Sequence, residues 1–175
     1  MSAHHFDPSI LRAYDIRGIY QQTLTDADAF AIGLAFTACM DQRNLAKRIA
    51  VGRDGRLSSL SLASHLIDGL VAGGAEIFDI GCGPTPMLYY ANEALATEAA
   101  IQVTGSHNPP THNGFKMVMG GAVFFGDDIT RLGAVSAAGS TRHAGGQRTE
   151  ISIFDDYVTR ILQGAHVGTV TAVWD

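Results

Sequence analysis

Residues 48–80 read RIAVGRDGRLSSLSLASHLIDGLVAGGAEIFDI, and this stretch decides the fold. It opens on a short apolar strand at Arg48–Gly52 and closes on a second one at Glu76–Ile80. Between them, Leu57–Gly73 repeats apolar residues at helical spacing and ends at a glycine pair. Two strands joined by a helix predict a right-handed β-α-β crossover, and therefore parallel pairing of the strands.

The sequence on both sides extends this unit. Thr25 and Asp28 form a capping-box variant ahead of a buried helix expected over residues 26–42. A further helix is expected from Pro86 to about Leu95, followed by a third strand at Ala99–Val103. These patterns predict mixed α/β architecture with a mainly parallel sheet. In such sheets, ligands bind at the carboxyl ends of the strands.

The second half of the chain changes in character. Residues 115–119 and 122–125 suit a hairpin turning at Gly120-Gly121, and a helix is expected over residues 127–138. Residues 139–150 are polar and lack periodicity, which predicts a linker.

The last stretch of sequence is too short for a core of its own. Residues 151–163 have a helical pattern and residues 168–174 alternate as a strand does. We therefore predict one domain over residues 1–150 and the truncated start of a second over residues 151–175.

Composition excludes several classes of protein. The chain has 175 residues, of which 46% are hydrophobic and 17% charged, as expected for a globular domain. The net charge of −5 and the lack of a basic stretch argue against binding to nucleic acid. No apolar run is long enough to span a membrane, and we find no signal peptide. Cys39 and Cys82 are expected to be buried thiols, so a cytoplasmic location follows.

A segment of turn-forming residues follows the third strand. Thr104–Pro110 reads TGSHNPP, and Asn113–Lys116 then reads NGFK. Glycine, asparagine and proline fix a non-helical backbone, so one serine, Ser106, is presented on a stiff turn with a cation nearby. A hydroxyl in that setting suits a group that carries phosphate. The alternative is a surface turn with an incidental serine.

Four motifs together resemble the α-D-phosphohexomutases, specifically their phosphomannomutase/phosphoglucomutase branch. They occur in the order of that family and cover about residues 11–118. The motifs are Arg12–Gly18 (RAYDIRG), Gly52–Arg56 (GRDGR), Pro84–Pro86 (PTP), and the serine segment with its NGFK turn. Each is weak alone, but the ordered set is specific.

The resemblance implies a three-layer αβα domain, the first of four in the family, and a phosphoserine at Ser106. Phosphoserine would give its phosphoryl group to a hexose monophosphate, forming a hexose 1,6-bisphosphate that returns its other phosphate to the serine. The net reaction interconverts hexose 6-phosphate and hexose 1-phosphate, with mannose or glucose phosphates as partners. The implied catalytic residues are Ser106, Lys116 and Arg17, and the implied substrate-binding residues are Tyr14, Arg17, His107 and Asn108.

The resemblance also implies Mg²⁺, bound to Ser106 through its phosphate. The family draws its other metal ligands from an Asp-x-Asp-x-Asp motif in the second domain, which this sequence lacks. We therefore expect those ligands beyond Asp175, and expect the chain to be inactive alone. For Asn108, an equal alternative is that its side chain only holds the turn.

Two functions are alternatives to the mutase reaction. One is a non-catalytic module that binds phosphosugars or takes part in assembly. The other is a serine hydrolase, which is disfavoured because the Gly-x-Ser-x-Gly pattern fails and because His107, adjacent to Ser106 in extended backbone, would point away from it. Arg53 and Arg56 flank Asp54, and for both we favour a structural role in holding a loop by ion pairing.

Overall fold

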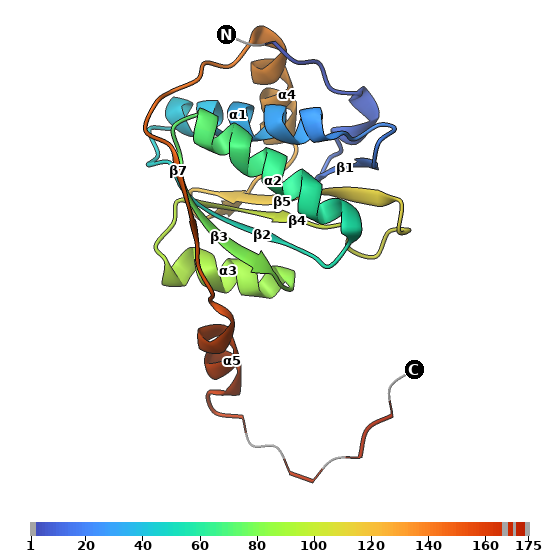
Figure 1. Cartoon of the computed structure of the whole chain (residues 1–175), viewed down its shortest axis with the longest axis vertical. Helices are drawn as coiled ribbons and strands as arrows, with labels where there is room; N and C mark the ends of the chain where they lie inside the picture. Colours follow the sequence, from blue (N-terminus) through green and yellow to red (C-terminus); the bar gives the residue numbers. More distant parts are fainter. Residues whose placement is uncertain (1–2, 166–167, 170, 174–175) are drawn as a thin grey trace.

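In the computed structural model, a mixed β-sheet lies between two layers of helices (Figure 1). The structure describes residues 3–165, 168–169 and 171–173. In this part of the chain the strands are β1 (Ile16–Ile19), β2 (Arg48–Arg53), β3 (Glu76–Cys82), β4 (Ala99–Val103), β5 (His112–Met119), β6 (Ala122–Val123) and β7 (Gln147–Glu150). The helices are α1 (Asp26–Gln42), α2 (Leu57–Ala72), α3 (Thr85–Ala94), α4 (Asp127–Ala138) and α5 (Phe154–Leu162), with a 3₁₀ turn at Pro8–Ile10.

The sheet has the order β1-β5-β4-β2-β3-β7, and β6 pairs with β5. Strand β2 pairs in parallel with β3 and β4, and β3 pairs in parallel with β7. These pairings confirm the predicted β-α-β crossovers. Strand β5 runs antiparallel to β1, β4 and β6, which makes the sheet mixed. The predicted hairpin of β5 and β6 is therefore present as well.

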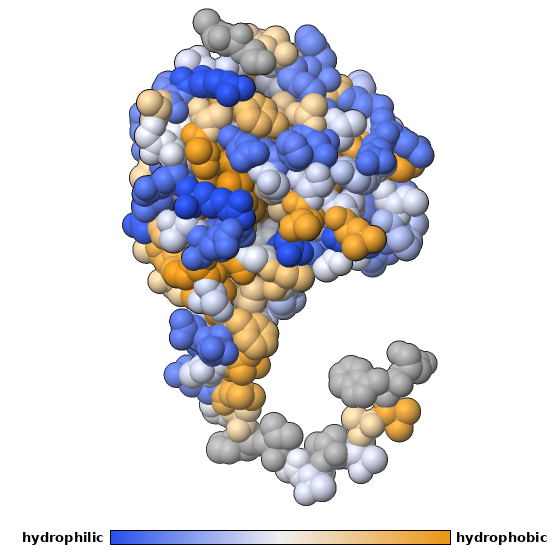
Figure 2. Space-filling view, viewed as in Figure 1, coloured by the Kyte–Doolittle hydropathy of each residue, from blue (hydrophilic) through white to orange (hydrophobic). Residues whose placement is uncertain are grey.

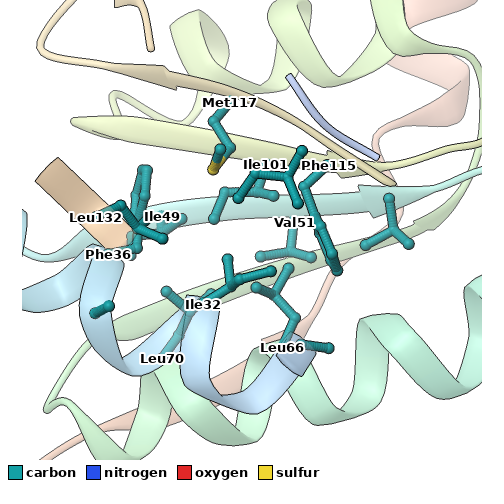
Figure 3. Packing of buried hydrophobic residues seen from close by; sticks show 14 of the residues in the cluster. Ile32, Phe36, Ile49, Val51, Leu66, Leu70, Ile101, Phe115, Met117 and Leu132 are labelled. Atoms are coloured by element: carbon teal, nitrogen blue, oxygen red, sulfur yellow. The ribbon is translucent and has the colours of Figure 1, made fainter. Parts of the chain in front are cut away.

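The larger core fills the space between the sheet and the layer formed by α1, α2 and α4 (Figure 1). Figure 3 shows side chains of α1 and α2 directed toward those of the sheet. Apolar residues alternate along each strand and recur at helical spacing along each helix. This spacing places them on the faces that meet in the core, where they are buried. This set includes Ile32, Phe36, Leu66, Leu70, Ile49, Val51, Ile101, Phe115, Met117 and Leu132.

Helix α3 covers the opposite face of the sheet with a smaller core. Ala50 and Ala100 lie beneath Leu88 and Ala91 of this helix. Small residues on the strands let the helix lie close to the sheet. Ile153, between β7 and α5, is buried in the same cluster.

The predicted helices agree with the structure to within a few residues. Helices α1 and α4 have the expected bounds, and α5 is shorter than expected, because it begins at Phe154. The capping box at the start of α1 is confirmed. The Thr25 side chain accepts from the Asp28 amide at 3.2 Å, and the Asp28 carboxylate accepts from the Thr25 amide at 2.7 Å.

The predicted linker over residues 139–150 is wrong in its last part, because Gln147–Glu150 form β7 at the edge of the sheet. All residues of β7 are exposed, so their side chains show no alternation of apolar and polar types. The strand is held by its backbone ladder to β3 and by an ion pair of 2.5 Å between Arg148 and Asp79. A polar edge strand of this kind gives no hydrophobic signal in a sequence.

Helix α5, which comes after β7, extends away from the sheet (Figure 1). Helix α5 contacts α3 through Tyr157, whose ring centroid lies 5.9 Å from that of Tyr90. Apolar side chains line α5 in Figure 2, and Phe154, Ile161 and Leu162 are exposed. Of the strand predicted over residues 168–174, positions 170 and 174 lie outside the described residues, and the others are not in a strand.

The two cysteines differ in environment. Cys39 of α1 is buried, as predicted, whereas Cys82 is exposed. Cys82 is the last residue of β3, beyond the cover of the helices, so the prediction of a buried thiol was wrong there. None of the helices formed by the described residues is both long and apolar enough to cross a bilayer.

Candidate active site

The carboxyl ends of three parallel strands meet at one edge of the sheet. Arg53, at the end of β2, is in register with Val103 of β4 and with Cys82 of β3. The segments that come after these strands therefore share one rim, as the sequence predicted. One of them, Thr104–Pro110, leaves β4 at this rim and is named the serine turn.

The serine turn presents Ser106 to solvent on a locally bonded backbone. Ser106 has φ 51°, in the left-handed region that non-glycine residues seldom adopt. Its amide donates to Thr104 Oγ1 at 2.9 Å, and the amide of Asn108 donates to the Gly105 carbonyl at 3.0 Å. The side-chain Nδ2 of Asn108 donates to the same carbonyl at 3.0 Å. In the structure, then, the Asn108 side chain holds the turn.

Asp54 accepts hydrogen bonds from the start of the serine turn and from the residues at the start of α2. Oδ2 accepts from Thr104 Oγ1 and from the Gly105 amide, both at 2.9 Å. Oδ1 accepts from the Arg56 amide at 3.0 Å and from Ser59 Oγ at 2.5 Å. Burial raises the pKa of Asp54, but these hydrogen bonds to the ionised form outweigh it and lower the pKa below its ordinary value.

Arg56 covers the serine turn from the other side. Its guanidinium donates to the carbonyl oxygens of Ser106 at 3.1 Å and Asn108 at 2.6 Å. It also donates to the carbonyl oxygens of Pro109 at 2.6 Å and His112 at 3.0 Å. Arg56 therefore holds the loop as expected, with one ion pair to Asp54 and mainly through carbonyl oxygens. Arg53 makes a single bond, from Nη1 to the Asp54 carbonyl at 3.3 Å.

His107 lies closer to Ser106 than the sequence predicts. Its Nδ1 is 3.3 Å from Ser106 Oγ. The expectation that the two side chains point apart assumed extended backbone, and the left-handed conformation of Ser106 turns them together instead. A hydrolytic triad would still lack its carboxylate, since no carboxylate in the described part of the chain forms an ion pair with His107.

Lys116 and Arg17 lie on one face of the sheet. Phe115 and Ile16 are register partners that face the larger core, so the residues that come next, Lys116 and Arg17, lie on the opposite face. Arg17 forms an ion pair with Asp15, and its Nε is buried without a hydrogen-bond partner. Neither cation is bonded to Ser106 within the described residues. The structure thus places them on β5 and β1, with no hydrogen bond or ion pair to the serine turn among the described residues.

Tyr14 stands apart from the other predicted site residues. Its side chain is 79% exposed, and its ring stacks on that of Phe125 with 6.4 Å between centroids. It makes no hydrogen bond to the serine turn among the residues described. The structure therefore joins Ser106, His107 and Asn108 in one turn, while the contact it records for the Tyr14 ring is with Phe125.

Asp54, Thr104 and Asn113 contribute to the site but were not singled out in the sequence. Asn113 is buried in β5, and its Nδ2 donates to Ser58 Oγ and Ser59 Oγ, both at 2.8 Å. Strand β5 is thereby tied to the first turn of α2. Asp54 and Thr104 lie within recognised motifs, which was the available signal. No signal in the sequence indicated that these two residues, 50 positions apart, form a hydrogen bond.

The described residues do not form a complete metal site. No group of three histidine, cysteine, aspartate or glutamate side chains in this part of the chain is placed to hold an ion. Ser106 alone, even with a phosphate, supplies one ligand group. Divalent cations such as Mg²⁺ require several oxygen ligands.

Comparison with known proteins identifies the family. The family model described as "Phosphoglucomutase/phosphomannomutase, alpha/beta/alpha domain I" matches residues 8–138. The chain belongs to this family. The match spans the phosphoglucomutase/phosphomannomutase domain from the 3₁₀ turn to the end of α4, and includes the serine turn, Asp54 and Arg56.

Individual relatives agree with the phosphoglucomutase/phosphomannomutase assignment. A phosphoglucomutase of Neisseria gonorrhoeae is 46% identical over 126 residues, covering 72% of this chain and 27% of that protein. A phosphomannomutase/phosphoglucomutase of Pseudomonas aeruginosa is 46% identical over 127 residues, covering 71% of this chain and 27% of that protein. The chain therefore spans about a quarter of the length of these relatives.

Solved structures show the same phosphoglucomutase/phosphomannomutase fold. A family protein from Burkholderia thailandensis superposes with a TM-score of 0.83 at 38% identity, covering 90% of this chain and 36% of that one. A putative phosphomannomutase from Thermus thermophilus superposes with a TM-score of 0.78 at 20% identity, which supports the fold alone. The predicted three-layer α/β/α domain is therefore confirmed.

Proposed function

We propose that this chain is the phosphoryl-carrying domain of a phosphohexomutase that interconverts hexose 6-phosphates and hexose 1-phosphates. The observation that carries the proposal is the presentation of Ser106. Its hydroxyl is exposed on a turn that Asp54 and Arg56 hold at the rim where the parallel strands end. Open α/β sheets bind their ligands at this rim. The names of the relatives support the reaction class.

In the proposed reaction, phosphoserine 106 transfers its phosphoryl group to a hydroxyl of a hexose monophosphate. The bond between phosphorus and Oγ breaks as the bond to the sugar oxygen forms, and the hydroxyl proton ends on Ser106. The hexose 1,6-bisphosphate then returns its other phosphoryl group to Ser106 by the reverse step. Little covalent chemistry falls to the protein, which positions the groups and neutralises charge.

The proposed roles of the remaining residues derive from their charge and place. Lys116 and Arg17 share one face of the sheet beside the turn and supply positive charge to the phosphate. His107 donates a hydrogen bond to phosphate or sugar oxygens, and so does Asn108 through the second N–H of the side-chain amide that also holds the turn. Tyr14 offers an exposed ring to the substrate.

Mg²⁺ is proposed as the cofactor, bound to Ser106 through its phosphate. When bound, the ion stabilises charge on the transferred group. Because the described residues offer no complete metal site, the other ligands come from a further domain of the whole protein. We propose residues 1–150 as the first domain and residues 151–175 as the start of the second. The chain alone is then inactive, and robust turnover of glucose 1-phosphate by it contradicts this.

The cellular setting proposed is the cytoplasm. Both cysteines are free thiols, which suits a reducing compartment.

Phosphopeptide mass spectrometry tests the proposal directly. Protein purified from cells should carry phosphate on Ser106, and Ser106→Ala in the whole protein should reduce mutase activity to background. Ser64→Ala, at an exposed serine of α2, is the matched control and should leave activity unchanged. An unmodified Ser106 together with a fully active Ser106→Ala protein would exclude the catalytic role.

The alternative is a non-catalytic module that binds phosphosugars or takes part in assembly. It rests on the same exposed serine turn at the rim where the parallel strands end. The two functions differ in the fate of phosphate. A binding module takes up glucose 1-phosphate without transferring its phosphoryl group, whereas the mutase moves labelled phosphate between sugar and Ser106.

A further inference from the structure

The guanidinium of Arg56 is fully occupied by the protein itself. A guanidinium has five N–H donors. Nη1 donates to the carbonyls of Pro109 and His112, and Nη2 to those of Ser106 and Asn108. The fifth donor, on Nε, faces Asp54 Oδ2 at 3.4 Å. An arginine beside a phosphoserine would ordinarily be assigned to the phosphate, but here no donor is left for it.

The shape of the serine turn is fitted to this guanidinium. A Cβ placed on Gly105 would lie 2.2 Å from Arg56 Cζ and 2.3 Å from Arg56 Nε, closer than atoms can approach. A side chain at position 105 could be accommodated only if the Arg56 guanidinium moved away from the turn. The glycine of the motif lets the flat guanidinium lie against the turn, where it reaches the carbonyl of Ser106 and three carbonyls that follow it in the chain.

Asp54 connects the two halves of the arrangement. It binds the start of the turn through Thr104 and Gly105, while Arg56 binds three later carbonyls of the turn and the carbonyl of His112 just beyond it. The Arg56 amide also donates to Asp54 Oδ1, so the carboxylate orients the residue that carries the guanidinium. Ser106 has the left-handed conformation that non-glycine residues seldom adopt unless their surroundings support it. These bonds hold it in place.

We infer that Arg56 is a positioning residue for phosphoryl transfer, which fixes Ser106 Oγ through the main chain of the serine turn and does not bind the phosphate. The catalytic consequence rests on the proposed function, but the ordering of the turn does not. A lysine keeps the charge but cannot span four carbonyls, because its ammonium is a compact group with three donors. Arg56→Lys therefore removes the hydrogen bonds of the guanidinium while it keeps the positive charge.

Hydrogen exchange tests the ordering of the turn in the chain. Arg56→Lys should speed exchange of the Asn108 amide at least roughly tenfold, since that amide closes the turn onto Gly105. Peptides from β4 and α1 should exchange as before, which shows that the fold persists. Arg53→Lys is the matched control, because Arg53 makes one bond at the same rim. Unchanged turn exchange in Arg56→Lys, or equal loosening in Arg53→Lys, overturns the inference.

Kinetics of the whole protein test the consequence for catalysis. Arg56→Lys should lower kcat on the order of 100-fold, as expected when a reacting group is misplaced by about 1 Å, with KM little changed. Added guanidinium ion should partly restore Arg56→Ala, whereas ammonium should not. A raised KM with unchanged kcat would instead assign Arg56 to ground-state binding. If Ser106→Ala stays active while Arg56→Lys loosens the turn, the proposed function fails and the positioning of the turn stands.

Discussion

Gly33 and Gly69 lie where α1 crosses α2, and each faces the backbone of the opposite helix. A Cβ on Gly33 would lie 2.3 Å from the Leu66 carbonyl oxygen, and one on Gly69 would lie 2.1 Å from the Phe30 carbonyl oxygen. No flexible side chain intervenes, so a methyl group at either position must push the helices apart. The close crossing brings both helices onto the same face of the sheet.

Gly69→Ala should therefore destabilise the protein. Alanine favours helix intrinsically, but overpacking against backbone costs about 1–3 kcal/mol or more, and the second effect should win. Denaturant titration with a fluorescence readout measures the change in the free energy of unfolding. Gly55→Ala serves as control, because no atom lies within 4 Å of its Cβ position. A Gly69→Ala protein as stable as the wild type would show that the helices can separate at no cost.

Thr25→Ala should remove one half of the capping box of α1. The Asp28 amide loses its acceptor at 3.2 Å, and the expected loss in the free energy of unfolding is about 1 kcal/mol. Thr25→Ser keeps the hydroxyl and should recover most of the stability. Thermal denaturation of the three proteins gives the comparison, and equal melting temperatures for the alanine and serine variants would count against the cap.

Asp54→Asn should change the pH dependence of stability. Because the pKa of Asp54 is lower in the folded protein, its stabilising contribution is complete above its ordinary value of 3.8. It disappears as the pH falls through the lowered folded value. The stability difference between wild type and Asp54→Asn should thus be constant near neutral pH and shrink in acid. Unfolding curves at several pH values measure it, and a difference that grows in acid contradicts the sign.

The two thiols should react at very different rates. Burial raises the pKa of Cys39 to about 11, so almost none of it is thiolate at pH 8, whereas Cys82 is exposed. A disulfide reagent should label one thiol per native chain and two in denaturant. Cys82→Ser should abolish the native reaction, and rapid labelling of Cys39 in that variant would mean that α1 opens readily.

The parts of the fold that depend on local pattern were predictable. The Thr25 cap predicted the first residue of α1, and the leucine spacing over residues 57–73 predicted α2. Each of these signals consists of residues that lie within a few positions of one another. Strand β7 was not predictable, since its four residues are all exposed and are held by backbone pairing to β3. Pairing of that kind depends on the fold and not on residue type.

The candidate site shows the same division. Ser106 stood out because turn-forming residues surround it, and the rim could be expected from the strand order. The partners of Arg56 could not be read from sequence, because they are main-chain carbonyls, which every residue possesses. The contact between Ser106 and His107 depends on the left-handed backbone of Ser106. The sequence analysis assumed extended backbone, in which adjacent side chains point apart, and so did not predict this contact.

The parallel pairing of β7 with β3 has a mechanical consequence. The chain leaves the sheet at Glu150, the residue in register with Asp79. Tension applied beyond this point pulls along the strand, so it loads the hydrogen bonds of the ladder together in shear instead of opening them one after another. Ile153, buried against α3, adds a second anchor just past the strand. Tension along the chain just beyond residue 150 is thereby passed to β3, in the same sheet as the strand that leads into the serine turn.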